Sequence, residues 1–220
     1  MNISTTEQLF DLSKTIAKDV LKDTKYPWEA LGKIKEFVYA LGQTLDPDVY
    51  ECVKDGVWIA KSAKVFPSAY IDAPTIICED AEVRHCAFIR GSVIVGRGSV
   101  VGNSCELKNA ILFDNVQVPH YNYVGDSILG HRSHMGAGSV TSNVKSDKSN
   151  VTVLCDGERV ETSLRKFGAI LGDGVEVGCN AVLCPGSVIG KNTTIYPLVR
   201  VRGYVDCDSI HKGDEIVKKR

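Results

Sequence analysis

An apolar residue recurs every six positions over most of this 220-residue chain, and this period constrains the fold more than any other feature. A period of six fits neither an amphipathic helix nor an alternating strand, and it is typical of a mainly β fold, the parallel β-helix of hexapeptide repeats. The register is irregular around His120 and then resumes at Val124, Leu129, Met135 and Thr141, and again from Leu171 to Val201. The first, unbroken run is Ile59, Val65, Ile71, Ile77, Val83, Ile89, Val95, Val101, Leu107 and Phe113.

In a β-helix of this kind each hexapeptide forms a short strand and a turn, and three hexapeptides close one triangular coil. The apolar side chains stack inside the coil. Successive coils are separated by the ordinary distance between paired strands, about 4.8 Å. Residues three hexapeptides apart are therefore expected to lie one above the other on the same face.

The first fifty residues lack this period and predict a helical segment, residues 1–50. Ser4 and Glu7 match a capping box, in which two side chains satisfy the free amides of a first helical turn. A second helix is expected to begin at Pro27 and to end near Gly42, because proline suits a first turn and glycine a C-terminal cap. The apolar positions at helical spacing in the first helix are Leu9, Leu12, Ile16 and Val20.

We expect these helices to form an α-helical hairpin that packs on the β-helix or on a neighbouring subunit. The β-helix itself is expected at residues 57–205, followed by a C-terminal tail at 206–220. The sequence KSDKSNVTVLCDGERVET interrupts the period at residues 145–162. Its valines flank a CDGE turn, so a β-hairpin that leaves the coil is predicted. Excursions from a solenoid commonly line its binding face, although a purely structural insertion is the alternative.

Composition excludes several classes of protein. The formal net charge is −1, from 26 basic and 27 acidic residues, which argues against nucleic acid and anionic membranes as partners. No basic and apolar leader opens the chain and no apolar run is long enough to span a membrane, so a cytoplasmic protein is expected. The eight cysteines contain no C-x-x-C pair, which argues against a zinc or thioredoxin-like redox site.

Arg90 and Lys108 each follow the apolar residue of their hexapeptide and are 18 positions apart. Their side chains should emerge from one face on neighbouring coils, about 4.8 Å apart. Stacked cations repel, so either acidic neighbours such as Glu82 and Glu106 offset them or they bind an anion such as a phosphate.

His120 falls where the register is irregular, with Tyr123 three residues later. The inside of a coil does not accommodate a charged imidazole, so a histidine at an irregular corner is expected to face a cleft between subunits. A hydrogen-bonded structural histidine is the alternative. Zinc binding of the kind found in γ-class carbonic anhydrases, which share this fold, is not expected because no two histidines here are five positions apart.

Four stretches carry a more specific resemblance: VGNSCELKNA, PHYNYVGDSILG, GAGSVTSN and GCNAVLCPGSVIG. They resemble the C-terminal domain of the bifunctional N-acetylglucosamine-1-phosphate uridylyltransferase and glucosamine-1-phosphate acetyltransferase family. The archaeal-type sugar-1-phosphate nucleotidylyltransferase/acetyltransferases are the most similar branch. This resemblance implies a left-handed β-helix, a homotrimer with sites at the subunit seams, and transfer of an acetyl group from acetyl-CoA to an amino-sugar phosphate such as glucosamine-1-phosphate, without a metal.

The resemblance also implies roles for individual residues. His120 becomes the general base that takes a proton from the amine, and the backbone amide near Ala137 stabilises the oxyanion. Arg90 and Lys108 hold the phosphate. Tyr123 and Asn143 are expected to contact the sugar. Coenzyme A is expected to lie along later coils, with cofactor-binding residues Ala137, Cys179, Lys191, Arg200 and Arg202.

The chain also departs from the family pattern. His134 replaces the usual asparagine two residues before GAG, and Val144 replaces a tyrosine of bacterial members. No glycine-rich phosphate loop opens the chain, so pyrophosphorylase activity is not expected. Two alternative functions remain at this point: a non-catalytic trimer that binds a sugar phosphate or nucleotide sugar, and an acyltransferase for another acidic amino sugar.

Overall fold

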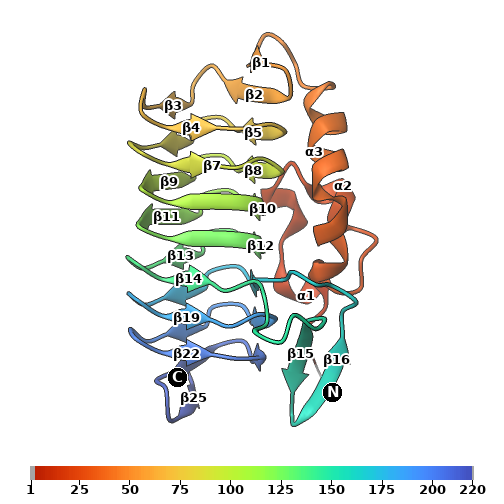
Figure 1. Cartoon of the computed structure of the whole chain (residues 1–220), viewed down its shortest axis with the longest axis vertical. Coiled ribbons are helices and arrows are strands. Elements are labelled where there is room, and N and C mark those ends of the chain that lie inside the picture. Colours follow the sequence, from red (N-terminus) through yellow and green to blue (C-terminus); the bar gives the residue numbers. More distant parts are fainter. Residues whose placement is uncertain (1–2, 220) are drawn as a thin grey trace.

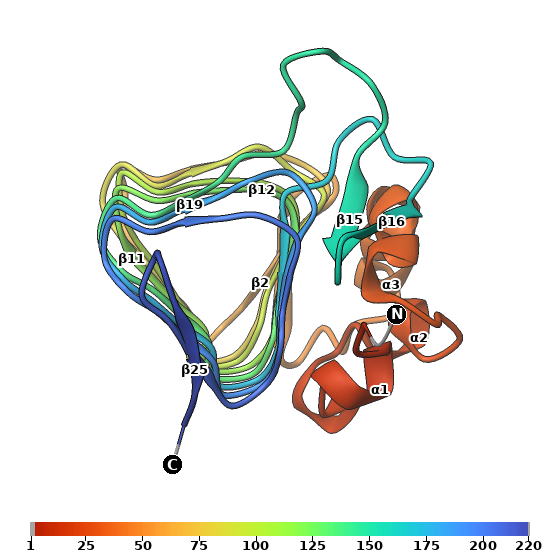
Figure 2. The same cartoon turned by 90° about the horizontal axis from the view of Figure 1, so that it is seen from below.

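A computed structural model describes residues 3–219 and shows a parallel β-helix with a helical N-terminal segment along one side (Figure 1). Viewed along its axis, the coil is triangular (Figure 2). The left-handed β-helix of hexapeptide repeats that the sequence predicts is therefore confirmed. Within residues 3–219, no helix is both long and apolar enough to cross a membrane.

We call the first face of the triangle the site face, because it carries Arg90, Lys108 and Tyr123. Its strands pair in parallel from coil to coil. They are β4 (Tyr70–Ile71), β7 (Phe88–Ile89), the first parts of β10 (Glu106–Leu112) and β12 (Tyr123–Leu129), β14 (Val140–Thr141), β19 (Val182–Leu183) and β22 (Arg200–Val201).

The second face is covered by the N-terminal helices, and we call it the covered face. An antiparallel strand, β1 (Tyr50–Lys54), closes its first end by pairing with β2 (Val57–Ala60). The parallel strands of this face are β2 (Val57–Ala60), β5 (Thr75–Ile77), β8 (Val93–Val95), the second parts of β10 and β12, β17 (Ala169–Leu171), β20 (Ser187–Ile189) and β23 (Tyr204–Val205).

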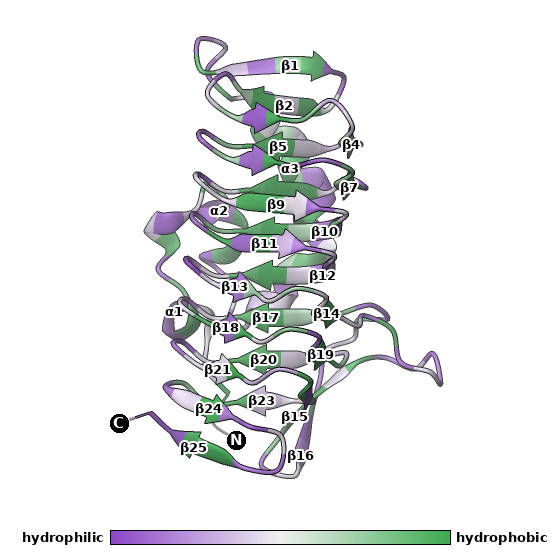
Figure 3. Cartoon of the chain, turned by 90° about the vertical axis from the view of Figure 1, so that its left-hand side faces the viewer, coloured by the Kyte–Doolittle hydropathy of each residue, from purple (hydrophilic) through white to green (hydrophobic). Residues whose placement is uncertain are grey.

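The third face is the nine-stranded sheet, which Figure 3 shows from outside and which we call the open face. It ends in an antiparallel pair formed by the last two strands. Its members are β3 (Lys64–Val65), β6 (Glu82–Val83), β9 (Val100–Asn103), β11 (Gln117–His120), β13 (His134–Met135), β18 (Glu176–Val177), β21 (Thr194–Ile195), β24 (Ser209–His211) and β25 (Ile216–Lys218).

The irregularity in the register begins earlier along the chain than the sequence indicates. Leu107 pairs with Ile89, 18 positions earlier, but Ala110 pairs with Val93, only 17 earlier. The corner after Leu107 is thus one residue shorter than the corner after Ile89, and the chain turns it within the continuous strand β10. The break in the period therefore begins before His120.

This shortening corrects the assignment of Phe113 to the coil interior. Leu112, not Phe113, pairs with Val95. Phe113 is also fully buried, but its ring lies 4.8 Å from that of Phe10, centroid to centroid, and so packs against the N-terminal segment. The apolar period thus predicted correctly that Phe113 is buried, but it predicted wrongly that Phe113 stacks on Val95 inside the coil.

The N-terminal segment is only partly as predicted. The first helix is broken into α1 (Thr6–Leu9), a 3-10 turn (Leu12–Lys14) and α2 (Lys18–Leu21). Asp11 accepts a hydrogen bond from the Ser13 amide at 3.0 Å, so a side chain replaces the backbone acceptor that a continuous helix would use.

The predicted capping box was displaced by one residue. Thr5 is the N-cap, and its amide donates to Gln8 Oε1 at 2.8 Å. Ser4 instead hydrogen-bonds the Tyr204 hydroxyl at 2.7 Å and so ties this segment to the coil.

The second helix agrees with the prediction. A 3-10 segment (Pro27–Lys33) leads directly into α3 (Ile34–Gly42). Gly42 is required where it lies, because a Cβ there would come within 2.2 Å of the Trp58 ring.

The segment at residues 145–162 forms a hairpin of β15 (Thr152–Cys155) and β16 (Glu158–Glu161). Asp156 and Gly157 both have positive φ, 50° and 81°, as a two-residue hairpin turn with right-handed twist requires. Val151 and Val153 are fully buried. The hairpin lies beside the helices and the covered face, while the loop before it borders the site face (Figure 2).

Candidate functional site

Asn103, His120, Ala137 and Cys179 lie in one column at the corner between the open face and the site face, and we call it the corner column. His120 pairs with Asn103 of the preceding coil. On the following coils Gln117 pairs with His134, and His134 pairs with Glu176. His120, Ala137 and Cys179 each follow one of these residues by three positions, so they are stacked in the same way. The structure thus places the proposed base, His120, on the same edge of the coil as Ala137 and Cys179.

The His120 corner is held by a buried amide. Asn122 is 2% exposed, and its Oδ1 accepts from the His120 amide at 3.1 Å. Its Nδ2 donates to the Gly136 carbonyl at 2.8 Å and to Ser139 Oγ at 3.1 Å on the next coil. Asn122 was not predicted as a functional residue, although it lies inside the motif that contains His120.

The ring of His120 is exposed and, within residues 3–219, has no hydrogen-bond partner. The other four histidines differ in this respect. A ring nitrogen of each hydrogen-bonds a protein group: His85 to Ser68, His131 to the Asp114 carbonyl, His134 to Glu176 and His211 to the Gly213 amide. The structural alternative therefore describes those four better than it describes His120.

Arg90 and Lys108 lie on successive coils, since the Arg90 amide donates to the Leu107 carbonyl at 2.8 Å. Glu106 Oε1 lies 2.7 Å from the Arg90 guanidinium, and this hydrogen bond raises the pKa of Arg90. Glu82 pairs with Arg84 instead. One of the two acidic neighbours considered from the sequence thus offsets Arg90, and Lys108 has no ion pair within residues 3–219.

Lys108 is half-buried, and burial lowers its pKa. The nearby cations Lys166 and Arg90 lower it further, while Asp126 opposes the shift. A lysine surrounded in this way gains most from a bound anion, because the anion restores the stability of its charged form. Lys166 is a neighbour that the sequence gave no reason to place here, since it follows the excursion.

Tyr123 and Asn143 meet above a buried carboxylate. Asn143 Nδ2 donates to the Tyr123 hydroxyl at 3.2 Å and to Asp126 Oδ2 at 2.5 Å. Asp126 is 5% exposed and also accepts from Asn109 Nδ2 at 2.9 Å. Burial raises the pKa of Tyr123, and the charges of Asp126 and Glu106 raise it further. The two predicted sugar contacts are thus fixed as a pair.

Asp126 was not assigned from the sequence, although it ends the H-x-x-Y-x-G-D element. Asn109 also donates to the Leu31 carbonyl at 3.2 Å, so the same network reaches the N-terminal helices.

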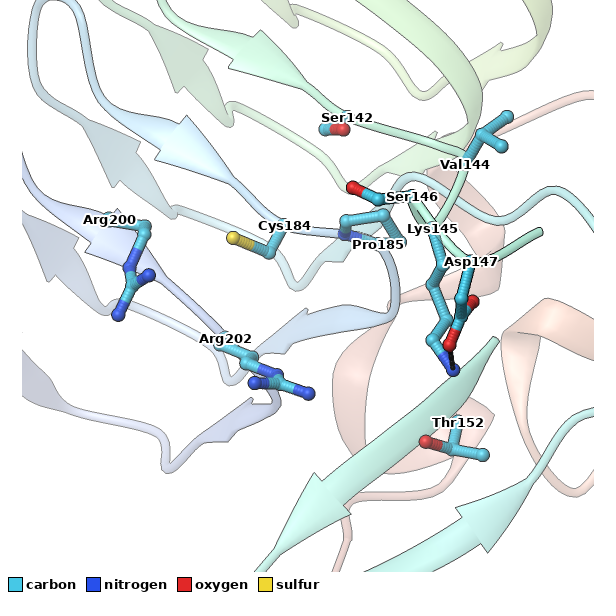
Figure 4. A pocket seen from close by; sticks show the side chains of 10 residues that line it. All are labelled: Ser142, Val144, Lys145, Ser146, Asp147, Thr152, Cys184, Pro185, Arg200 and Arg202. Carbon is cyan, nitrogen blue, oxygen red and sulfur yellow. Dashed lines mark ion pairs between the residues drawn. The ribbon is translucent and has the colours of Figure 1, made fainter. Parts of the chain in front are cut away.

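A basic pocket of about 410 Å³ lies further along the site face, between the coil and the loop that leads into the hairpin (Figure 4). Arg200 and Arg202 line one side, and the ion pair of Lys145 and Asp147 lies across from them. Within residues 3–219, neither arginine has an acidic partner. The structure therefore places two of the predicted cofactor residues in one anion-accepting pocket.

Lys191 is separated from these arginines. It lies after β20, at the corner between the covered and open faces, where Asp173 pairs with it at 3.3 Å. Cys179, by contrast, is exposed and borders an apolar groove of about 320 Å³ on the open face, together with Gly136 and Pro197. The arginines and Cys179 thus line two separate hollows, and Lys191 lies apart from both.

Among residues 3–219, no three His, Cys, Asp or Glu side chains are grouped as metal ligands would be.

Comparison with known proteins gives the family. Residues 71–205 match the family described as the GMPPB C-terminal domain. The chain belongs to this family. The match begins in the strand β4 and ends in β23, so it includes the corner column, the two cations and the basic pocket.

Curated relatives of this GMPPB C-terminal family member are bifunctional proteins. The chain is 33% identical over 208 residues to the "Bifunctional protein GlmU" of Methanococcus maripaludis. This alignment covers 92% of the chain and 50% of that protein. It is 32% identical over 145 residues to the "Bifunctional sugar-1-phosphate nucleotidylyltransferase/acetyltransferase" of Sulfurisphaera tokodaii, covering 66% and 36%. The chain thus spans about a third to a half of the length of the curated relatives it matches.

Among solved structures, the acetyltransferase domain of PglB from Neisseria gonorrhoeae aligns with 64% of the chain and 54% of its own length. The TM-score is 0.29 and the sequence identity 21%.

Proposed function

We propose that the chain is an acetyl-CoA-dependent N-acetyltransferase that acts on an amino-sugar phosphate such as glucosamine-1-phosphate. The observation that carries this proposal is the exposed and unpartnered His120 ring, held in place at the corner beside Ala137, on the coil that follows Lys108. The proposal is supported by the matching family and by the acetyltransferase named in the Sulfurisphaera relative.

His120 would act as the general base. An amine attacks a thioester only in its neutral form, and a histidine suits proton removal near neutral pH, an effect worth about 10² to 10⁴ in rate. The amine nitrogen forms a bond to the acetyl carbonyl carbon, His120 accepts the amine proton, and the carbon–sulfur bond breaks with the thiolate as leaving group. No covalent acyl-enzyme is needed.

The Ala137 amide would stabilise the oxyanion that forms in this step. Within residues 3–219 this N–H donates to no protein acceptor, whereas the neighbouring Gly136 and Gly138 amides are bonded to carbonyls. A free, rigidly held backbone donor of this kind is typical of an oxyanion hole.

Arg90 and Lys108 would hold the phosphate of the acceptor, and Tyr123 and Asn143 its sugar ring. Fixing the acceptor in this way supplies part of the acceleration through orientation alone. Arg200 and Arg202 would bind the phosphates of acetyl-CoA, whose thioester then reaches the corner column beside Cys179. Lys191 is left out of this assignment because of its distant corner and its pairing with Asp173.

We also propose that the chain works as a homotrimer, with the corner column facing a neighbouring subunit. Exposed apolar side chains flank this corner, including Tyr121 at 67% and Leu198 at 78% exposed. Exposed apolar groups of this size at one edge are typical of a protein contact.

Thiol release from acetyl-CoA, measured against a panel of amino-sugar phosphates, tests the proposed activity. Turnover with glucosamine-1-phosphate or its galactose isomer is the expected result. If the folded protein binds such a phosphate but turns over none of the panel, the non-catalytic alternative is correct and the proposal is wrong.

A further inference from the structure

Two exposed aromatic side chains extend the site face beyond the phosphate-binding pair. Tyr70 pairs with Phe88, and Phe88 with Glu106, so the two rings occupy the same column as Tyr123 on the preceding coils. Tyr70 is 55% and Phe88 43% exposed, and their ring centroids are 5.6 Å apart. They form a continuous apolar surface on the first coils of this face.

A pocket of about 540 Å³ lies over these rings. Ser68 and Asp72 line it with groups that accept hydrogen bonds, and Ser68 can also donate. Its size falls within the range of about 300–1,000 Å³ usual for small-ligand sites. A flat apolar wall with polar groups at its rim suits a planar heterocycle, which offers an aromatic face and a hydrogen-bonding edge.

Cations connect this pocket to the phosphate site. Arg90 lines the pocket and also forms the phosphate-binding pair, and its guanidinium lies 5.9 Å from the Phe88 ring centroid. Lys54 Nζ lies 5.4 Å from the Tyr70 ring centroid and 3.7 Å from Asp72. A ligand on the rings would therefore have positive charge beside it at the end that meets Arg90.

The order of groups along the coil axis identifies the ligand. The aromatic pair lies on β4 and β7, the cations lie at the end of β7 and in β10, and Tyr123 and His120 follow on the next coil. Base, phosphates and sugar follow one another in the same order in a nucleotide sugar. From Tyr70 to Tyr123 the chain makes three coil steps, a separation of about 14 Å at the usual strand spacing.

We propose that Tyr70 and Phe88 bind the nucleobase of a nucleoside diphosphate-linked amino sugar, whose diphosphate lies against Arg90 and Lys108. This inference rests on the proposed function for the position of the sugar at His120. It defines the acceptor as a nucleotide-linked amino sugar in preference to a simple sugar phosphate, and it gives the aromatic pair a role in acceptor affinity only.

The test compares UDP-glucosamine with glucosamine-1-phosphate as acceptors for wild type, Tyr70→Ala and Phe88→Ala. Removing one stacking ring should lower kcat/KM for UDP-glucosamine by roughly tenfold, mainly through KM, because base–aromatic stacking has about this worth. The value for glucosamine-1-phosphate should stay unchanged. Phe88→Tyr keeps a ring and should behave as wild type. Ile216→Ala removes an exposed apolar group at the other end of the coil and, as a control, should also behave as wild type.

Calorimetry with UDP separates this inference from the proposed function, because it needs no turnover. UDP binding that weakens in Tyr70→Ala supports the aromatic site even if no acceptor is acetylated. Wild-type turnover of both acceptors at rates unaffected by either alanine variant would overturn the inference and leave the acetyltransferase intact. Dissociation of the oligomer by Tyr70→Ala or Phe88→Ala in sedimentation would also overturn it, since the rings would then be a subunit contact.

Discussion

Lys108 links the electrostatics of the free site to its expected pH dependence. Burial, Lys166 and Arg90 all disfavour its charged form, so its pKa lies below the ordinary lysine value of 10.5. The charged form is present below the folded-state pKa and is lost as pH rises through it. Phosphate affinity should therefore fall at a lower alkaline pH than it would with an ordinary lysine.

Glucose-1-phosphate is a suitable probe for this effect, because it has the phosphate but no titrating amine. Its Kd, measured by calorimetry as pH is raised, should begin to increase at a lower pH in the wild type than titration of an ordinary lysine would give. Lys108→Arg keeps its charge and should remove the dependence. An equal rise in both proteins would show that another group controls the affinity.

The cysteines near the proposed cofactor path should not be essential. Cys179 borders the apolar groove and Cys184 the basic pocket, but direct attack on the thioester requires neither. Cys179→Ala and Cys184→Ala should each keep turnover within about tenfold of wild type, well above the loss expected for an absent nucleophile. A pre-steady-state burst of thiol that disappears in one variant would instead reveal an acyl-cysteine.

At the scale of elements, the close contact of β9 with β11 positions His120. A Cβ on Gly102 would come within 1.5 Å of the Pro119 carbonyl oxygen, so β11 must move in Gly102→Ala. Overpacking of this kind typically costs about 1–3 kcal/mol, and the displaced strand carries the base. We expect a lower Tm and slower transfer.

Gly32→Ala is the matched control for this change. A Cβ at Gly32 meets nothing within 4 Å and lies in a helical segment, so the substitution should stabilise the fold by about 0.4–1 kcal/mol. Equal Tm and activity in Gly102→Ala and wild type would contradict the account of the corner.

Some features of these strands and corners could be predicted from the sequence and others could not. Repetition predicted the coil because every hexapeptide repeats the same burial pattern, and spacing alone placed Arg90 beside Lys108. It did not predict the shortened corner after Leu107, since one missing residue between two apolar positions leaves their burial unchanged. Asn122 and Asp126 were not predicted for a related reason: most of their hydrogen-bond partners come from other coils, which a single polar residue in the sequence does not indicate.

In the whole molecule, the proposed site requires subunits that meet at the corner column. Leu198 is 78% exposed and follows Pro197, which borders the groove with Cys179. In sedimentation at micromolar concentration we expect a trimer for wild type and a monomer for Leu198→Asp, which places a charge in the contact. Leu198→Met should remain trimeric. A monomeric wild type would contradict the seam-located site.

The most direct test of the central claim is the rate of acetyl transfer in His120→Ala. With glucosamine-1-phosphate or UDP-glucosamine as acceptor, kcat should fall by about 10² to 10⁴, while the affinity for acetyl-CoA and the Tm stay close to wild type. His85→Ala, assayed with glucosamine-1-phosphate, is the control, because His85 lies on an earlier coil of the same edge and its ring hydrogen-bonds Ser68. We expect the rate of acetyl transfer to fall in His120→Ala and to stay unchanged in His85→Ala. Undiminished transfer in His120→Ala would show that another group removes the amine proton and that the corner column is not the catalytic centre.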